Sequence, residues 1–472
     1  MTARFNDSEV LQATGAVKTR PGTQLSFEGV CTDSRQLTKG CLFVALKGER
    51  FDAHDFLEQV VANGAAAVLV NATFPLPTAW GEGQGEGPCA IYTVPDTLHA
   101  LGRLARFHRD RFHIPIAAVT GSNGKTTTKE LVASILAVRG PALKTHGNLN
   151  NEIGVPLTLF GLEPTHVAAI IEMGMNHAGE ITRMVDIARP DAGLITIVQP
   201  AHLEGLGSIE GVAQAKGELF RGLAPTATAV INLDDARIVT QSQGLHSRTL
   251  TYGRAEAAQV RLTKVEPRGR NGLTLEITYA GARYPVALNL VGDHNAMNAA
   301  GAFALALSVG YSPEECVRGL EAAQAHARRL QFLDAPHGVT VVDDCYNANP
   351  ASMSAALRTV HDLATAGRAV AVLGDMLELG AEETQEHTQL GVIAAEHVSL
   401  LAFFGPRTAH AYTQAVKKLG ANVKHFEDVG ALVAWLQQAL QPNDYVLVKG
   451  SRGMRLERVV EALTGTSQGG GH

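Results

Sequence analysis

The sequence has few cysteines and no long apolar run. Its five cysteines are scattered and include no Cys-x-x-Cys pair. This argues against a disulfide framework or a zinc site and favours reduced thiols in a cytoplasm. The longest apolar run, around Ala299–Val309, is too short to span a bilayer, and the first ten residues hold no apolar signal segment. We therefore expect a cytoplasmic protein with no membrane partner.

Charge is scarce as well. Only 18% of the 472 residues are charged, and the formal net charge is -6. A general nucleic-acid or membrane-surface binder needs a basic excess, so we expect no nucleic-acid partner. The hydrophobic content of 45% is that of a globular protein, and the length suggests two to four domains. We expect a monomer, and no internal repeat is visible.

A phosphate-binding loop is the clearest local signal. An apolar, β-branched run from Ile114 to Val119 predicts a buried strand, and a helix is expected to follow as far as Arg139. The turn between them and the first helical residues form one polar segment: Gly121, Ser122, Asn123, Gly124, Lys125, Thr126 and Thr127. Glycines and a helix N-terminus suit a close approach to phosphate.

In this loop, Lys125 would contact the β- and γ-phosphates of a nucleotide, and the Thr126 hydroxyl would bind Mg²⁺. The standard P-loop has Gly six residues before the Lys, where this chain has Val119. The loop is therefore a variant, and an ordinary Gly-rich turn between a strand and a helix is the alternative interpretation.

Alternating apolar runs and helical patterns predict an α/β protein of three domains. Residues 1–95 form a small α/β unit, and residues 96–328 contain a mostly parallel sheet of the P-loop type. Within the second unit, residues 258–290 predict an added antiparallel meander, with Asn271-Gly272 as its hairpin signal. Residues 329–472 form a third α/β unit.

Two further side chains are expected at the same edge of the central sheet. Glu172 ends a strand expected over Val167–Glu172, and His202 follows one expected over Leu194–Val198. Ligands bind at the carboxyl ends of parallel strands, so Glu172 is a candidate Mg²⁺ ligand and His202 a candidate metal or phosphate contact. A helix cap and an ordinary surface His are the respective alternatives.

Lys216 lies among small apolar residues of a predicted helix. A snorkelling surface Lys is the ordinary interpretation. A desolvated Lys, in contrast, has a lowered pKa and can take up CO₂ as a carbamate, which would turn it into an anionic oxygen ligand for Mg²⁺.

Several Asn and Arg side chains could recognise a substrate or nucleotide. Asn148, Asn150 and Asn151 share one loop, where they suit either a sugar or base, or simply a turn. Asn295 and Asn298 begin a helix, as caps or as adenine contacts. Arg329 could reach over the nucleotide from the edge of the third unit or could end a solvated helix.

Polar groups also follow strands of the outer units. In the third unit, the segments around residues 343–350, 373–380 and 446–454 would face one cleft if the sheet is parallel. In the first unit, a polar triplet follows a strand and suits phosphate or ribose, although a plain turn is the alternative. The candidate substrate contacts are Asp33, Ser34, Arg35, Asn148, Asn151, Tyr346, Asn347, Asn349, Lys449 and Ser451.

Together these motifs resemble the Mur ligases of peptidoglycan synthesis. The matching segments occur in the family's order and at family-like spacing: Thr120–Thr127, Gly147–Pro156, Glu172–Met175, Ala201–Ser208, Ala215–Glu218, His294–Ala299 and Asp343–Pro350. The resemblance covers nearly the whole chain. It implies that residues 1–95 bind the UDP substrate, that residues 96–328 bind ATP, and that residues 329–472 form a Rossmann-like domain.

The resemblance also implies roles for individual residues. Lys125 would contact the phosphates of ATP, Thr126 and Glu172 would bind Mg²⁺, His202 would support a second metal, and Lys216 would be a carbamylated lysine. Asn295 and Asn298 would lie near adenine, whereas Arg329 and Asp344 would reach ATP from the third domain. Cys345 stands where the family is expected to have Ser.

The implied reaction is ATP-dependent amide formation. The motifs are most similar to members that use UDP-N-acetylmuramoyl-tripeptide and D-alanyl-D-alanine. ATP would phosphorylate the tripeptide carboxylate, and the dipeptide amine would attack the acyl phosphate. Exclusion of water from the acyl phosphate predicts domain closure.

Three alternatives fit the sequence less well. The member that adds the third amino acid is expected to carry an Asp-Asn-Pro-Arg motif, which is absent. Folylpolyglutamate synthase fits the Asn-rich loop poorly. A nucleotide switch without ligase chemistry leaves Glu172, His202 and Lys216 with no shared purpose.

Overall fold

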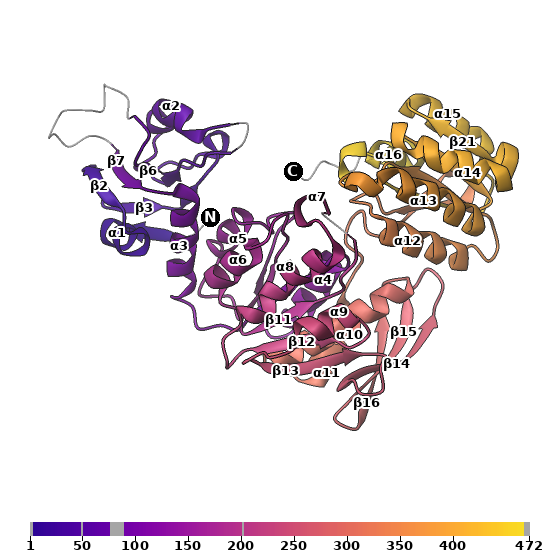
Figure 1. Cartoon of the computed structure of the whole chain (residues 1–472), viewed down its shortest axis with the longest axis horizontal. Helices are drawn as coiled ribbons and strands as arrows, with labels where there is room; N and C mark the ends of the chain where they lie inside the picture. The colour runs from indigo at the N-terminus through magenta and orange to yellow at the C-terminus, as the bar shows by residue number, and fades with distance from the viewer. Residues whose placement is uncertain (1–2, 49–50, 76–88, 201–202, 467–472) are drawn as a thin grey trace.

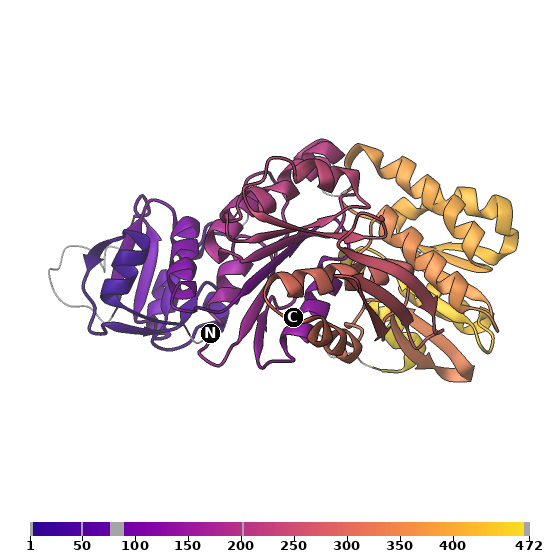
Figure 2. The same cartoon turned by 90° about the horizontal axis from the view of Figure 1, so that it is seen from below.

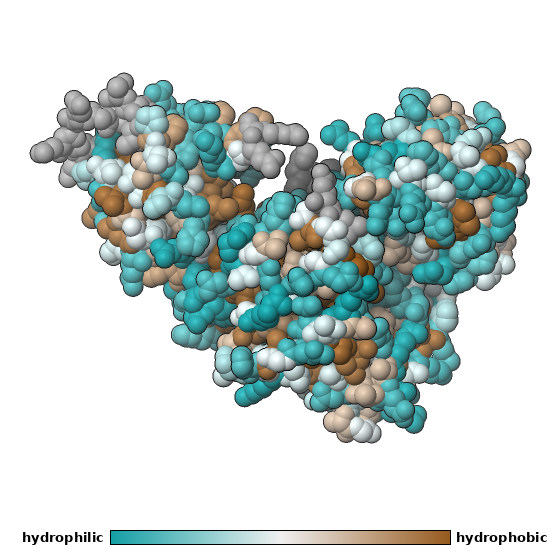
Figure 3. Space-filling model, in the orientation of Figure 1, coloured by the Kyte–Doolittle hydropathy of each residue, from teal (hydrophilic) through white to brown (hydrophobic). Residues whose placement is uncertain are grey.

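The computed structural model describes residues 3–48, 51–75, 89–200 and 203–466. Three units, each built on a β-sheet, lie in chain order across the molecule (Figures 1 and 2). The N-terminal and C-terminal units flank the central one, and the surface is hollowed between them (Figure 3). No helix within these described ranges is long and apolar enough to cross a membrane.

The N-terminal unit has a five-stranded sheet in the order β2-β7-β6-β5-β4, parallel except for the β2–β7 pair. Strands β1 and β3 pair separately. The strands are β1 Arg4–Asn6, β2 Val17–Arg20, β3 Ser26–Glu28, β4 Val30–Cys31, β5 Leu42–Val44, β6 Ala67–Asn71 and β7 Ala90–Val94. The helices are α1 Asp7–Thr14, α2 Leu57–Ala62 and α3 Thr97–Arg109.

Helix α3 joins the N-terminal unit to the central one. Its buried face contributes Leu101 and Leu104 to an apolar core that runs without interruption from Phe5 to residues beneath the central sheet. The ring of Phe5 meets that of Phe160 edge-on, with centroids 6.0 Å apart. The two units are therefore held together by apolar burial, which is the main stabilising contribution in folded proteins.

The central sheet has nine strands in the order β16-β15-β14-β13-β12-β11-β8-β10-β9. Pairing is parallel from β9 to β14 and antiparallel through β15 and β16, as the predicted meander requires. The strands are β8 Ile116–Thr120, β9 Ala142–Lys144, β10 Ala168–Glu172, β11 Ala192–Ile195, β12 Thr228–Asn232, β13 Arg248–Gly253, β14 Val260–Pro267, β15 Leu273–Tyr279 and β16 Ala282–Leu288.

Helices cover both faces of this sheet. One apolar layer packs α5, α6, α8 and α9 on one face, and a second packs α4, α10 and α11 on the other. The helices are α4 Lys125–Leu136, α5 Gly154–Leu159, α6 Glu180–Ala188, α7 Leu203–Leu206, α8 Ile209–Arg221, α9 Ala236–Gln241, α10 Asp293–Ser308 and α11 Pro313–Ala322. Burial on both faces explains why the parallel strands read as continuous apolar runs.

The C-terminal unit has a six-stranded sheet in the order β17-β18-β22-β19-β20-β21, parallel except for β17. The strands are β17 Gln331–Ala335, β18 Val339–Asp343, β19 Ala369–Gly374, β20 Leu400–Phe404, β21 Val423–Phe426 and β22 Tyr445–Lys449. The helices are α12 Pro350–Leu363, α13 Glu383–His397, α14 Ala409–Leu419, α15 Val429–Ala439 and α16 Glu457–Thr464. Because β18, β22 and β19 are neighbours, their polar ends meet at one edge.

The predicted three-part α/β architecture is confirmed, whereas the boundaries after residues 95 and 328 stay predictions. One predicted strand is too long: Leu194–Val198 leaves the sheet after Ile195. After Ile195 the chain instead contacts the glycine loop, because Ser122 N donates to Ile197 O over 2.8 Å. The next residue, Val198, donates its N–H to the Asp235 carboxylate over 2.7 Å.

Candidate active site

The glycine loop lies between β8 and α4, at the carboxyl end of the central sheet. Gly121 has a φ of 149°, and a β-carbon there would lie 1.8 Å from Thr196 Oγ1. Gly124 has a φ of 80°, and a β-carbon there would lie 2.4 Å from Asn298 Oδ1. Only glycine fits both positions, because the backbone is left-handed at Gly124 and neighbouring side chains are close at both.

Lys125 closes the loop on itself. Its ammonium donates to the Gly121 carbonyl over 2.7 Å. Burial lowers the pKa of Lys125, while the nearby Glu172 carboxylate opposes that shift and Arg329 adds to it. The lysine charge is therefore close to the two groups that the sequence assigns to metal and nucleotide.

Glu172 ends β10, which pairs directly with β8, and its register partner is Val119. The side chain is 2% exposed. One carboxylate oxygen accepts a hydrogen bond from Asn150 Nδ2 over 2.8 Å, whereas Oε2 is buried with no partner within the described residues. A buried carboxylate oxygen without a donor is costly, so it suits a cation ligand.

Lys216 is 2% exposed, on the buried face of α8. The interpretation as a snorkelling surface lysine is therefore wrong. Burial lowers its pKa well below the ordinary value, and repulsion from Lys125 adds to the shift. A lowered pKa increases the neutral fraction of this amine at a given pH. The predicted partner His202 lies outside the described residues.

Arg329 crosses from the linker before β17 to the nucleotide loop. Its Nη2 donates to the Thr126 hydroxyl over 3.0 Å, and its guanidinium stacks 4.4 Å from the ring centroid of Tyr346. The Nε atom is buried and has no partner in the described chain. Tyr346 thus holds a cation over the first turn of α4, where phosphate oxygens are expected.

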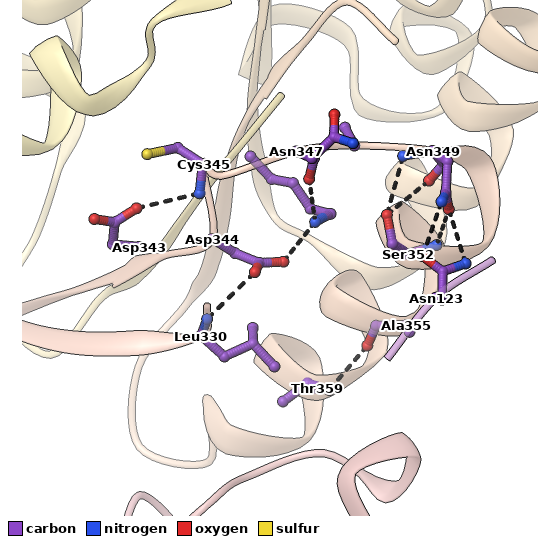
Figure 4. A network of polar contacts seen from close by, with 12 residues as sticks. Asn123, Leu330, Asp343, Asp344, Cys345, Asn347, Asn349, Ser352, Ala355 and Thr359 are labelled. Carbon is purple, nitrogen blue, oxygen red and sulfur yellow. Dashed lines mark hydrogen bonds and ion pairs between the residues drawn. The ribbon is translucent and has the colours of Figure 1, made fainter. Parts of the chain in front are cut away.

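A pair of amides also links the loop to the C-terminal unit (Figure 4). Asn349 Nδ2 donates to Asn123 Oδ1 over 2.8 Å, and Asn123 Nδ2 donates back to Asn349 Oδ1 over 3.2 Å. Asn123 Nδ2 also donates to Gln199 Oε1 over 2.6 Å. Asn349, the residue before α12, therefore binds directly to the loop that would hold phosphate.

Asp344 and Asn347, which follow β18, lie beside this contact (Figure 4) and belong to a network of strand ends in the C-terminal unit. Lys449 Nζ pairs with the Asp344 carboxylate over 2.6 Å and donates to Asn347 O over 3.0 Å. Ser451 Oγ accepts from Leu377 N over 2.9 Å. Three strand ends are thereby joined, as the parallel order predicts.

Other candidates lie nearby but use their polar groups internally. Asn295 Nδ2 donates to Val291 O, and Asn298 Nδ2 donates to Asn295 Oδ1. Asn151 Oδ1 accepts from Gly154 N over 2.8 Å, at the start of α5. Asn151 thus has the turn role of the ordinary interpretation. The cap interpretation of Asn295 and Asn298 is wrong, because the N-cap of α10 is Gly292 and no side chain caps this helix. Asn148 lies in the same loop as Asn151, and half-buried Thr127 lies in the first turn of α4.

The triplet Asp33-Ser34-Arg35 lies in the N-terminal unit, on a short 3₁₀ turn. Arg35 forms an ion pair with Asp33 at 2.7 Å. Because this triplet lies in the N-terminal unit, it is not among the groups brought together around the glycine loop. Its role as a substrate contact stays a prediction.

Sequence reasoning missed two residues that hold Glu172. Asn150 shares a loop with the candidate substrate contacts Asn148 and Asn151, but it is the amide that contacts the carboxylate. Thr145, whose hydroxyl accepts from Glu172 N over 2.9 Å, gave no signal, because a single Thr after a short strand carries no motif. Gln199, a contact of Asn123, follows a strand end and could have been found there.

Comparison with known proteins places this site in a family. Three Mur ligase domain descriptions match successive parts of the chain: the Mur ligase family catalytic domain at residues 26–109, the Mur ligase middle domain at 119–306, and the glutamate ligase domain at 328–452. The chain belongs to the Mur ligase family.

Two similar proteins of that family carry the same name. The chain is 40% identical to the UDP-N-acetylmuramoyl-tripeptide--D-alanyl-D-alanine ligase of Escherichia coli K12, over 94% of this chain and 95% of that protein. It is 35% identical to the enzyme of the same name from Bacillus subtilis 168, over 93% and 94%.

Solved structures agree with the sequence relatives. A crystal structure of MurF from Acinetobacter baumannii superposes with a TM-score of 0.88 at 33% identity, covering 98% of this chain and all of that one. MurF ligase from Thermotoga maritima, solved in complex with ADP, gives a TM-score of 0.80 at 26% identity, over 94% and 97%.

Proposed function

We propose that this protein is an ATP-dependent ligase that joins D-alanyl-D-alanine to the terminal carboxylate of UDP-N-acetylmuramoyl-tripeptide, a step of peptidoglycan precursor synthesis. Relatives that match over almost the whole chain carry the name of this activity. The observation that supports it best is the buried oxygen of Glu172 that has no partner among the residues the structure describes. It lies one strand away from the glycine loop, and its carboxylate interacts electrostatically with Lys125.

The donor set fits Mg²⁺. A carboxylate oxygen of Glu172 and the Thr126 hydroxyl are hard oxygen ligands, and His202 is proposed to support a second ion. Bound there, Mg²⁺ would offset the charge that develops on the transferred phosphate. Arg329 now donates to Thr126, so a second cation at that hydroxyl would repel it, and Arg329 is expected to turn towards the nucleotide phosphates.

Lys125 and the loop amides would bind the β- and γ-phosphates after the lysine releases the Gly121 carbonyl. The tripeptide carboxylate would then attack the γ-phosphorus to give an acyl phosphate, with ADP as the leaving group. The dipeptide amine would attack the acyl carbon and lose a proton, and phosphate would leave as the amide forms. Water must stay out at that point, so we propose that the C-terminal unit closes over the loop.

We propose a separate role for each of the three units. Residues 1–95 bind the UDP moiety, residues 96–328 bind ATP, and residues 329–472 complete the site. Asn295 and Asn298 would lie near adenine, and Asp344 would reach ATP. The substrate contacts would come from Asp33, Ser34 and Arg35 in the first unit, from Asn148 and Asn151 in the second, and from Tyr346, Asn347, Asn349, Lys449 and Ser451 in the third.

For Lys216 we propose carbamylation. Its ammonium would lose one proton, and the neutral amine would then add to CO₂ and release a second proton. A buried cation beside Lys125 would thereby be replaced by an anion, which removes their repulsion. Protein incubated with ¹³C-bicarbonate should then show a carbamate carbon signal that Lys216→Met lacks. Lys216→Ala activity should recover partly with formate or acetate. No difference in the carbon signal and no recovery would rule the carbamate out.

The function is tested by product mass. The protein with ATP, Mg²⁺, UDP-N-acetylmuramoyl-tripeptide and D-alanyl-D-alanine should give the UDP-N-acetylmuramoyl-pentapeptide, and Glu172→Gln should not. Omission of the dipeptide should remove the product. Tripeptide formed from the UDP-dipeptide and a free amino acid would instead support the family member that adds the third residue.

A further inference from the structure

Lys129 is a buried cation for which the proposed reaction has no use. It lies one helical turn after Lys125 on α4 and is 1% exposed. Its Nζ donates to Thr145 O over 2.8 Å and pairs with Glu130 Oε1 at 2.9 Å. A buried ion pair is rarely the most stable choice for a core, so its specific contacts point to a positioning role.

The contact with Thr145 leads directly to the carboxylate of the proposed Mg²⁺ site. The β9–β10 ladder ends at the pair Lys144–Ile170, so Glu172 N has no strand partner on that side. The Thr145 hydroxyl supplies the missing acceptor at 2.9 Å. On the other side, Glu172 stays in register with β8. The main chain of Glu172 is thus fixed by one hydroxyl that extends the sheet.

The same segment holds the Glu172 side chain as well. Asn150 Nδ2 donates to Glu172 Oε1, and Asn150 O accepts from Gly174 N over 2.7 Å. Thr145 therefore fixes the backbone of Glu172, and Asn150 fixes its carboxylate. Lys129 links the main chain of Thr145, at the start of this segment, directly to α4.

Glu130 completes the arrangement. Burial opposes its ionisation, but hydrogen bonds from Lys144 and Lys129 outweigh burial and hold the pKa of Glu130 below its ordinary value. Its second oxygen pairs with Lys144 Nζ at 2.5 Å. The carboxylate therefore remains charged at neutral pH and compensates the buried Lys129 ammonium.

We propose that Lys129 is a positioning residue for the Mg²⁺ site: through Thr145 it holds the Glu172 carboxylate oriented for the metal. The inference rests on the proposed function for the identity of that site. Groups that orient metal ligands typically change metal affinity by 10- to 100-fold when removed. The role is indirect, since Lys129 contacts neither substrate nor metal.

The test uses Mn²⁺ as the probe, measured by electron paramagnetic resonance on the full chain with ADP. Lys129→Met should weaken Mn²⁺ binding by at least about tenfold, and Lys129→Arg should restore part of it. Lys144→Met is the matched control, because Lys144 pairs with the same Glu130 but donates no hydrogen bond to Thr145. That variant should bind Mn²⁺ like the unaltered protein.

A second pair of variants covers the case in which Lys129→Met fails to fold. Thr145→Val removes the acceptor at nearly constant volume and should weaken Mn²⁺ binding, whereas Thr145→Ser should not. Unchanged Mn²⁺ binding in folded Lys129→Met, or in Thr145→Val, would overturn the proposal. Because this readout needs no ligase turnover, failure of the proposed function would show separately, as an unaltered protein that binds Mn²⁺ but forms no pentapeptide.

Discussion

The amide pair between Asn123 and Asn349 predicts how a single side chain controls docking of the C-terminal unit. Asn349 has two jobs: its side chain caps α12 by accepting from Ser352 N over 2.9 Å, and it exchanges two hydrogen bonds with the glycine loop. The variant Asn349→Ser keeps the helix cap but removes the two hydrogen bonds to the glycine loop. Serine caps helices about as well as asparagine, but its hydroxyl is too short to reach Asn123.

The expected effect follows from the two lost hydrogen bonds. A neutral hydrogen bond contributes about 0.5–1.5 kcal/mol net, and this pair is half-buried, so the loss is roughly 1–2 kcal/mol. At about 1.4 kcal/mol per factor of ten, the docked arrangement should become about 5- to 30-fold less populated relative to the released one. The cap is retained, so the thermal stability of α12 should change little.

Single-molecule energy transfer measures this population. Dyes on cysteines introduced at exposed Gln243 and Lys418 would report the distance between the central and C-terminal units. Asn349→Ser should shift the distribution away from the docked distance. Ser352→Ala is the control, because it disturbs the α12 cap and leaves the amide pair in place. The same distance distribution in Asn349→Ser and the unaltered protein would refute the reasoning.

Three further predictions follow from burial and backbone geometry. Burial lowers the pKa of His108 from 6.5 to about 4, so its stabilising contribution is complete above pH 6.5 and is lost towards pH 4, by about 3 kcal/mol at most. Urea unfolding of His108→Phe should depend less on pH in that window, and an equal dependence would contradict the account. Gly124→Ala forces a left-handed alanine against Asn298 and should weaken ADP binding at least about tenfold; unchanged affinity by calorimetry would be incompatible with the loop geometry. The lowered pKa of Lys216 means that its charge destabilises the fold below that pKa and that this cost disappears near pH 10.5. Without CO₂, Lys216→Met should therefore unfold at a higher temperature at pH 7, with a gap that closes at high pH.

The elements predicted best are those in which the spacing of apolar residues along the segment itself indicates a helix or a strand. The strand expected over Val167–Glu172 is observed as β10, and the antiparallel meander expected over residues 258–290 is observed as β14, β15 and β16, because burial sets the apolar pattern of these segments. The short strands Ala142–Lys144 and Gln331–Ala335 were missed. Such segments bury little of their own surface, and it is the neighbouring strand that makes them extended.

In the candidate site, too, some features could be predicted from the local sequence and others could not. The place of Glu172 beside the glycine loop could be predicted, because ligands bind at the carboxyl ends of parallel strands. The burial of Lys216 could not be predicted, because the small residues around it are equally typical of a surface helix. The reciprocal pair of Asn123 and Asn349 joins positions 226 residues apart, and no spacing in one sequence predicts such a contact.

The central claim is that ATP activates the tripeptide carboxylate and that the dipeptide amine then displaces phosphate. The most direct measurement uses UDP-N-acetylmuramoyl-tripeptide whose terminal carboxylate carries ¹⁸O at both oxygens, with ATP and D-alanyl-D-alanine. We predict one ¹⁸O atom in each phosphate released, in equal amount to the pentapeptide formed, and no pentapeptide without the dipeptide. Phosphate free of ¹⁸O, or phosphate release that ignores the dipeptide, would contradict the account.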